Sequence, residues 1–305
     1  MNYSNDVREF LTTRRARITP AKAGLPTFAG TRRVAGLKRE EVAMLAGMST
    51  EYYARLERGN LRGVSEPVLE SLASALQLDE AERTHLFNLA RAAMAASRPA
   101  RTRKPRTELR PSIEGVLRGM SGTPAYVRNA RMDIVAANSL CFALYAGVLE
   151  PETLPVNLAR FVFLDPRSHD FFVKWDSIAD DLASSLRVRS GKSPTDSALK
   201  SLVGELITGS QDFATRWARH DVRFHRTARK VLRNPVVGEI ELTGDSLELP
   251  GEDLTIVVYT AEPGSRDQEK LDFLASWSSD QRAAGKSGAA DQSVESEARK
   301  SSQDH

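Results

Sequence analysis

Apolar side chains recur at three- and four-residue spacing through the first 95 residues, which is the period of amphipathic helices. This pattern predicts five helices joined by short turns, over residues 7–18, 37–47, 50–59, 65–77 and 79–94. Helix-start signals agree with two of these ranges, because Ser65 precedes Pro67 and Asp79 precedes two acidic residues. Residues 1–95 are therefore predicted to form one all-helical domain.

The hydrophobic pattern stops at residues 96–110, which offer almost nothing to bury. They hold two prolines and six arginines or lysines, and this composition favours a basic linker. The same charge could also touch a nucleic-acid backbone. Residues 278–305 are polar and poor in aliphatic side chains, so we expect a disordered tail there.

Between residues 111 and 277 the pattern mixes the periods of strands and helices. Two short strands are expected around a turn at 129–131, followed by helices over 139–147, 157–163, 168–189, 195–208 and 210–219. Alternating apolar and polar residues then predict a strand over 236–243, and a turn at 243–245 leads to a second strand over 246–250. Residues 254–263 are apolar on both faces, as expected of a central strand. The second domain is therefore expected to be α+β, with a small antiparallel sheet covered by helices.

Residues 39–58 carry the features of a helix-turn-helix. Gly47 lies between the two helices, where a tight turn requires a positive φ, and Ser49 is placed to cap the second helix. The residues expected to fill the corner are small or apolar: Val42, Ala43, Ala46, Met48, Tyr53 and Leu56. In such a motif the second helix is held outward and presented to a DNA groove.

The outward face of that second helix is polar, and the candidate DNA-binding residues are Arg39, Ser49, Thr50, Glu51, Tyr52, Arg55 and Arg58. Arg55 could donate to N7 and O6 of guanine, and Glu51 could accept from N4 of cytosine. Arg39 and Arg58, at helix ends, are better placed for phosphates. The alternative is an ordinary helical hairpin whose charged face is solvated.

The distribution of charge favours the DNA interpretation. Residues 1–107 hold 19 lysines and arginines against 11 acidic residues, whereas the rest of the chain holds 24 against 29. A basic front joined to an acidic back suggests that the front meets a polyanion such as double-stranded DNA.

The composition of the 305 residues describes a globular protein, with 41% hydrophobic and 27% charged residues. No apolar run is long enough to cross a membrane, and the charged N-terminus does not read as a secretory signal. The single cysteine, Cys141, lies in an apolar context and is expected in a core. These features suggest a cytoplasmic protein that does not associate with membranes.

Longer stretches of the sequence carry a resemblance to a known family. Residues 32–59 and 64–91 resemble the XRE-type helix-turn-helix regulators of actinobacteria. The stretches at 123–147, 161–182, 213–222, 234–243 and 254–265 resemble the MmyB-like ligand-binding domain usually fused to them. The resemblance covers roughly residues 5–277 and implies a five-helix DNA-binding domain followed by a PAS-like sensory domain. It also suggests an apolar, fatty-acyl-like small-molecule effector.

A PAS-like domain usually encloses a pocket, and the sequence offers apolar and polar residues for one. The candidate ligand-binding residues are Phe163, Trp217, His220 and Arg223. Trp217 and His220 are three apart and share a helical face, and a ligand carboxylate could use His220 or Arg223. The alternative is that Trp217 belongs to the core and that His220 satisfies a buried backbone group.

Catalysis is not indicated, because His220 and Asp221 are adjacent in sequence and no serine or cysteine motif accompanies them. The spacing of His220 and His225 does not suit a metal site, and we expect neither a metal nor a cofactor. The sequence thus predicts a ligand-responsive, sequence-specific DNA-binding regulator, as a homodimer if it matches two half-sites. The alternative is a DNA-tethered module for protein interaction or dimerisation without a small-molecule effector.

Overall fold

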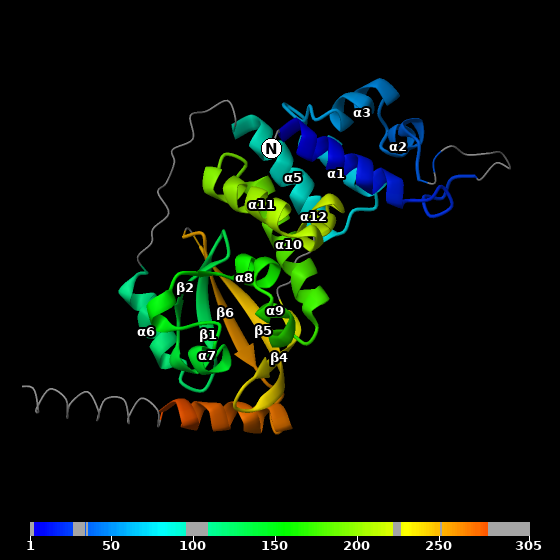
Figure 1. Cartoon of the computed structure of the whole chain (residues 1–305). Coiled ribbons are helices and arrows are strands. Elements are labelled where there is room, and N and C mark those ends of the chain that lie inside the picture. The colour runs from blue at the N-terminus through cyan, green and yellow to red at the C-terminus, as the bar shows by residue number, and fades with distance from the viewer. Residues whose placement is uncertain are drawn as a thin grey trace, which may run out of the picture. The chain divides into compact units, whose positions relative to one another are not determined.

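The helical period of the N-terminal sequence produces five helices in the computed structural model (Figure 1). They are α1 (Tyr3–Arg17), α2 (Arg39–Leu45), α3 (Thr50–Glu57), α4 (Glu66–Ala75) and α5 (Glu80–Ala95). The structure describes residues 3–26, 34, 36–95, 109–221, 227–250 and 252–279. The predicted linker and the predicted tail lie almost entirely outside these residues.

The described residues group into two compact units. The first unit joins residues 3–95 to 162–165 and 176–221, and the second contains residues 109–161, 166–175 and 227–279. Further helices of the first unit are α10 (Trp175–Lys192), α11 (Ser197–Gly209) and α12 (Gln211–Ala218). The first residue of α10, Trp175, still belongs to the second unit. Helix α8 (Leu158–Leu164) ends in this unit and α9 (Arg167–Phe171) lies in the second.

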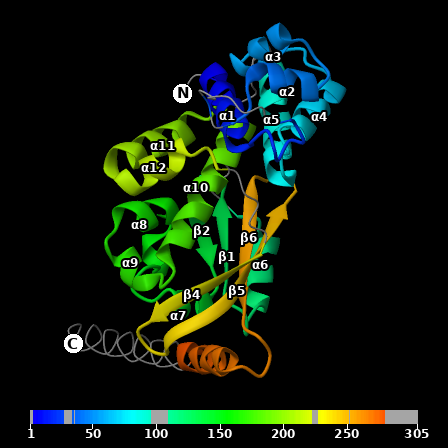
Figure 2. The same cartoon turned by 90° about the vertical axis from the view of Figure 1, so that its right-hand side faces the viewer.

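The core of the first unit includes α10 as well as the five N-terminal helices. Val188 of α10 is buried in the same apolar cluster as Phe10, Leu56 and Leu72. His85 of α5 lies so close to α10 that a Cβ at Gly191 would come within 2.6 Å of its ring. Both views show α10, α11 and α12 beside α1 (Figure 1 and Figure 2).

The second unit contains a six-stranded antiparallel sheet in the order β3-β2-β1-β6-β5-β4. Its strands are β1 (Ala125–Asn129), β2 (Asp133–Ala137), β3 (Val156–Asn157), β4 (Thr227–Asn234), β5 (Gly238–Leu249) and β6 (Leu254–Thr260). Helices α6 (Pro111–Gly119), α7 (Ser139–Leu144) and a helix over 266–279 accompany it, with a short 3-10 turn at Pro151–Thr153. The expectation of an α+β second part is confirmed.

One detail of the predicted meander is wrong. Thr243–Asp245 is not a turn, because β5 continues through it as one strand of 12 residues. Gly244 is required there for a different reason, since a Cβ would lie 2.9 Å from Cε1 of Tyr259 on the neighbouring strand. The turn instead follows Asn234, whose side chain accepts hydrogen bonds from the backbone of Val236 and Val237.

Buried aromatic rings fill the interior of the second unit. The hydroxyl oxygens of Tyr145 and Tyr259 lie 2.6 Å apart, and Tyr126 stands edge-on to Tyr145 with 6.1 Å between the ring centroids. Phe171 packs on Tyr145 at 5.1 Å and on Phe161 at 5.9 Å. These buried aromatic residues therefore contact one another.

Candidate DNA interface and ligand site

The turn between α2 and α3 has the geometry that its sequence predicts. Gly47 has a φ of 64°, in the left-handed region that glycine adopts without strain. The Met48 amide donates to the carbonyl of Ala43 at 2.9 Å and closes the corner. Ser49 caps α3 by accepting from the Tyr52 amide at 3.1 Å. The direction in which α3 leaves the turn is thereby fixed.

Helix α3 buries one face and exposes the other. Tyr53, Leu56 and Glu57 are buried, together with Val42, Ala43 and Ala46 of the preceding helix and its end. Thr50, Glu51, Arg55 and Arg58 are exposed, and Tyr52 is half-buried at the edge. The division predicted from the sequence between corner residues and outward residues is therefore present.

Tyr52 supports Arg55 on the exposed face. The guanidinium carbon of Arg55 lies 5.1 Å from the centroid of the Tyr52 ring, within the range of a cation–π contact. Such a contact restricts the rotamers of a long side chain and reduces the entropy lost on binding. Arg55 is thus held on the outward face of the helix.

The buried end of α3 holds a charged residue that the sequence argument did not single out. Glu57 is 2% exposed, and its carboxylate pairs with Arg15 of α1 at 2.8 Å and with Arg39 of α2. Burial alone would raise the pKa of Glu57, but hydrogen bonds from Arg39 and Arg15 outweigh it and hold the pKa below its ordinary value. Glu57 therefore ties three helices together as an anion.

Arg39 pairs with Glu57 and is also accessible from the surface. Its side chain is 55% exposed although its Nε is engaged by Glu57, so the side chain is both paired and accessible. An arginine has five donors in a fixed fork, so one carboxylate contact does not exhaust it. The ion pair orients Arg39 at the start of α2.

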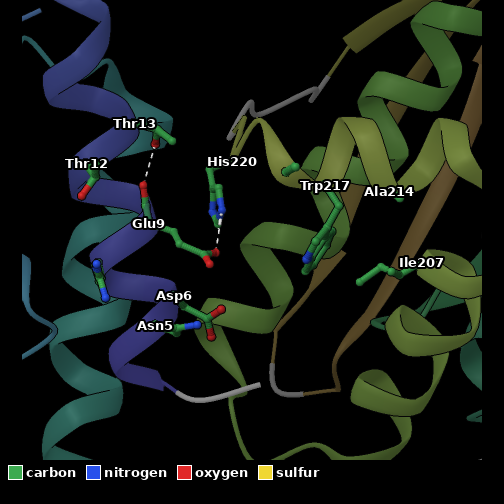
Figure 3. Close-up of a pocket in the computed structure, with 11 residues that line it drawn as sticks. Asn5, Asp6, Glu9, Thr12, Thr13, Ile207, Ala214, Trp217 and His220 are labelled. Atoms are coloured by element: carbon green, nitrogen blue, oxygen red, sulfur yellow. Dashed lines mark hydrogen bonds and ion pairs between the residues drawn. The ribbon is translucent and has the colours of Figure 1, made fainter. Parts of the chain in front are cut away.

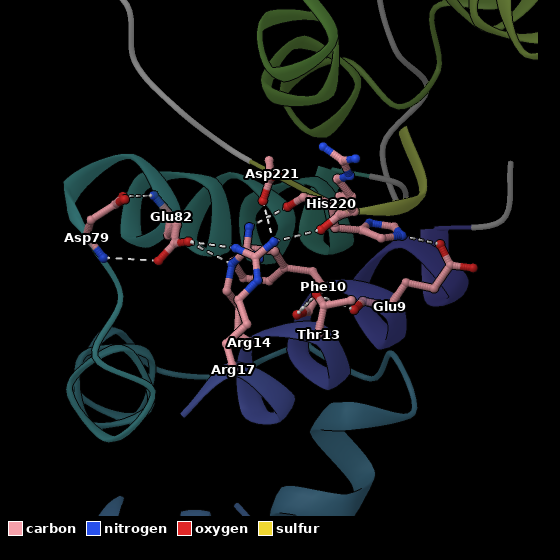
Figure 4. A network of polar contacts seen from close by, with 10 residues as sticks. Glu9, Phe10, Thr13, Arg14, Arg17, Asp79, Glu82, His220 and Asp221 are labelled. Atoms are coloured by element: carbon pink, nitrogen blue, oxygen red, sulfur yellow. Dashed lines mark hydrogen bonds and ion pairs between the residues drawn. The ribbon is translucent and has the colours of Figure 1, made fainter. Parts of the chain in front are cut away.

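A second network joins α1 and α5 to the end of α12 (Figure 4). Arg14 pairs through Nε with Glu82 of α5 at 2.8 Å and donates through Nη2 to the carbonyl of His220. Arg17 pairs with Asp221 and donates to the carbonyl of Arg219 at 3.1 Å. The last turn after α12 is therefore anchored to the N-terminal helices.

Trp217 and His220, both proposed as ligand residues, line one cavity within the first unit (Figure 3). The cavity has a volume of about 640 Å³, and α1 forms its other wall, through residues from Asn5 to Thr13. Nε2 of His220 lies 2.8 Å from Oε2 of Glu9 across the cavity. Burial and the nearby Arg187 and Arg14 lower the pKa of His220 to about 3, so the ring is neutral and donates to Glu9.

The other two proposed ligand residues are placed differently. Phe163 packs edge-on against Phe213, with ring centroids 4.9 Å apart, and is not among the residues that line the cavity. Arg223 lies outside the described residues. Asp6 and Glu9 of α1 line the cavity and were missed, since nothing in the sequence brings residues 6 and 220 together.

Comparison with known families places both parts of the chain. Residues 109–274 match the MmyB-like transcription regulator ligand binding domain, and residues 13–86 match a helix-turn-helix domain. Both families consist of transcription regulators and not of enzymes. A search of curated proteins finds no match to the chain. Among the described helices, none has the length and apolar character needed to cross a membrane.

Proposed function

Because this chain belongs to the MmyB-like transcription regulators and carries a helix-turn-helix domain, we propose that α3 reads base sequence in double-stranded DNA. The observation that carries this proposal is the exposed face of α3, where Arg55 stands beside Tyr52 while Tyr53 and Leu56 anchor the opposite face. The family establishes DNA binding and ligand binding in general terms. The residues and the ligand chemistry are our own assignment.

Each exposed residue of the motif has a role that suits its chemistry. Arg55 donates to N7 and O6 of guanine, and Glu51 accepts from cytosine. Thr50 and Tyr52 contact a base or a phosphate at the edge of the groove. The capping residue Ser49 and the two arginines at helix ends hold the phosphate backbone: Arg39 and Arg58.

Replacing Arg55 tests the assignment of base readout. Arg55→Ala should cost about 1–3 kcal/mol on the preferred site and should relax the sequence preference. The operator is first selected from random duplexes with the full chain, and affinities are then measured by fluorescence anisotropy. Arg91→Ala, at an exposed position of α5 outside the motif, is the matched control. An equal loss of affinity on selected and scrambled duplexes would make Arg55 a phosphate contact.

We also propose that the ligand is a small molecule with an apolar body, and that its binding controls DNA affinity. The cavity lined by Trp217 and His220 supports this proposal, because its volume of about 640 Å³ lies within the usual range for ligand sites. The regulator acts in the cytoplasm as a homodimer on two half-sites. Native mass spectrometry of the purified chain tests both points, since it reports subunit number and any retained small molecule. A monomer that retains only a partner protein would favour the interaction-module alternative.

A further inference from the structure

The cavity between α1 and helices α11 and α12 has one charged wall and one apolar wall (Figure 3). Asp6 and Glu9 lie one turn apart on α1 and line it from one side. Ile207, Ala214 and Trp217 line it from the other side. The Ile207 side chain is 39% exposed and adds apolar surface to this wall.

The carboxylate of Asp6 is incompletely satisfied. Among the described residues its one ion pair is with Arg187, whose Nη1 lies 3.9 Å from Oδ1 of Asp6, and the charge of Lys200 acts on it from farther away. Burial raises the pKa of Asp6, the positive charge of Arg187 opposes this rise, and the neighbouring Glu9 adds to it. A cation delivered into the cavity would relieve both the desolvation and the repulsion between the two acids.

Trp217 supplies an unused donor on the opposite wall. The residue is 8% exposed, and its ring is covered by the Arg187 guanidinium at 3.6 Å and by Phe213 at 5.4 Å. No described residue accepts a hydrogen bond from its indole N–H, and this N–H is not among the fully buried polar atoms, so it remains accessible from the cavity. The donor is therefore open to an acceptor on a bound molecule.

We propose that this cavity binds a small organic amine with an apolar body and a neighbouring oxygen acceptor, a proposal that rests on the ligand response proposed above. The ammonium donates to Asp6 and to the free oxygen of Glu9. The oxygen of the ligand accepts from the indole of Trp217, and the apolar body covers Ile207 and Ala214. The ring faces of Trp217 are already occupied, so recognition of the cation relies on hydrogen bonds to carboxylates.

The same geometry disfavours a carboxylate ligand such as a fatty acid. Two acidic side chains line the cavity together with one exposed cation, Arg8, and the adjacent Arg187 is already engaged by Asp6 and the Trp217 ring. The neutral ring of His220 already donates to Glu9, so it offers no positive charge to an anion. An amine is the charged group that the wall can receive.

A ligand in this cavity would contact the N-terminal helices directly. Its partners on α1 belong to the helix whose Arg15 holds Glu57 of α3. Its partner Trp217 precedes the turn that Arg14 and Arg17 anchor. Occupancy would therefore stabilise the contact between α1 and α12 and change the affinity of the full chain for its operator.

Three matched probes test the proposal on the full-length protein: phenylalaninol, 3-phenyl-1-propanol and 3-phenylpropanoate. Binding is followed through the indole N–H signal of Trp217 in a ¹H–¹⁵N spectrum, assigned with Trp217→Phe. Phenylalaninol should shift that signal in a saturable way, and the alcohol and the acid should bind at least about tenfold more weakly. Equal binding of all three, preference for the acid, or no shift with any probe would overturn the proposal.

Two variants test the contributions of the charged wall and of the apolar wall to amine binding. Asp6→Asn removes the charge and should weaken phenylalaninol at least about tenfold, whereas Glu80→Gln, at an exposed position of α5, should not. Trp217→Phe keeps the ring and removes the donor, and it should weaken phenylalaninol about threefold or more, read by ligand-observed NMR. If neither cavity variant changes phenylalaninol binding, the proposal is wrong.

Measuring operator binding of the same samples distinguishes a failure of the amine site from a failure of the proposed DNA recognition. With the probe absent, wild type and Glu80→Gln should bind the selected operator alike. Saturating phenylalaninol should change operator affinity of the wild type at least about threefold. Normal operator binding without any response to the amine would refute the amine site alone, and no operator preference at all would refute the proposed function.

Discussion

At the scale of single residues, Glu57 shows how one buried charge organises the helix-turn-helix. It receives Arg15 and Arg39 from two other helices, and the hydroxyl of Tyr53 lies 3.5 Å from the same carboxylate. A buried acid of this kind is stable only while its cationic partners remain in place. The position of α3 therefore depends on Glu57, which lies on the buried face of the helix.

Replacing this acid should be strongly destabilising. Glu57→Ala should lower the free energy of unfolding by about 3–5 kcal/mol, because it strands the partly buried guanidinium of Arg15. Glu51→Ala on the exposed face of the same helix should change it by less than about 0.5 kcal/mol. Urea unfolding of the full chain at pH 7 measures both. Similar small effects for the two variants would contradict the role given to Glu57.

Two buried histidines should make the first unit sensitive to mild acid. Burial, Arg187 and Arg14 lower the pKa of His85 and of His220 to about 3, whereas an unfolded histidine titrates near 6.5. Below pH 6.5 the unfolded chain binds protons that the folded chain does not, so the free energy of unfolding falls as pH falls. The slope approaches about 1.4 kcal/mol per pH unit for each histidine.

Urea unfolding between pH 7.5 and 5 measures this slope. His220→Asn should reduce it, and asparagine tolerates the φ of 52° at this position. The exposed His169, changed to Asn, serves as the control and should leave the slope unchanged. A wild-type free energy of unfolding that does not depend on pH in this range would contradict the buried neutral histidines.

The exposed and buried faces of α3 could be predicted from the sequence because they depend on local spacing alone. The partners of Glu57 could not be predicted, since Arg15 lies 42 positions away. Trp217 and His220 line one cavity, but the opposite wall comes from a helix about 200 residues earlier in the chain. Contacts of that separation follow from packing and leave no periodic signal.

At the scale of elements, strand β4 was missed and the turn beside it was misplaced. Its sequence, TARKVLRN, is mostly charged or polar, and only Leu232 and Asn234 are buried. The strand lies at the edge of the sheet, where polar and charged side chains are usual. When β4 is not recognised, Thr243-Gly244-Asp245 resembles a hairpin turn. In the structure, a glycine is needed at position 244 because a Cβ there would collide with the ring of Tyr259.

Substitution of Gly244 tests that demand. Gly244→Ala should displace the Tyr259 ring, disturb its hydroxyl contact with Tyr145, and cost about 1–3 kcal/mol of stability. Gly204→Ala, in an exposed and open position of α11, should instead stabilise by up to about 1 kcal/mol. Thermal unfolding of the two variants gives the comparison. A neutral or stabilising Gly244→Ala would show that the turn, and not the close contact, explains the glycine.

At the scale of the whole molecule, the N-terminal helices do not form a unit by themselves. Residues 176–221 fall within the range that matches the ligand-binding family, yet they pack with α1 and α5. The contacts include Val188 in the shared core, Gly191 against His85, and Arg14 against the carbonyl of His220. Residues within the match to the ligand-binding family therefore contact helices of the helix-turn-helix part directly.

An isolated N-terminal fragment should accordingly be less stable than the same helices in the full chain. In a fragment of residues 1–107, Arg14 loses the His220 carbonyl and His85 loses its cover from α10. Amide hydrogens of α1 and α5 should exchange at least about tenfold faster in the fragment. Hydrogen exchange followed by mass spectrometry compares the two. Equal protection would mean that α10–α12 contribute nothing to the stability of those helices.

The central claim is that the full chain recognises a DNA sequence through α3. The most direct measurement is the ratio of its affinities for the selected operator and for a scrambled duplex of equal length, taken by anisotropy at physiological salt. The account predicts a preference of about 10³ or more, which Arg55→Ala reduces. Equal affinity for both duplexes would contradict sequence-specific recognition.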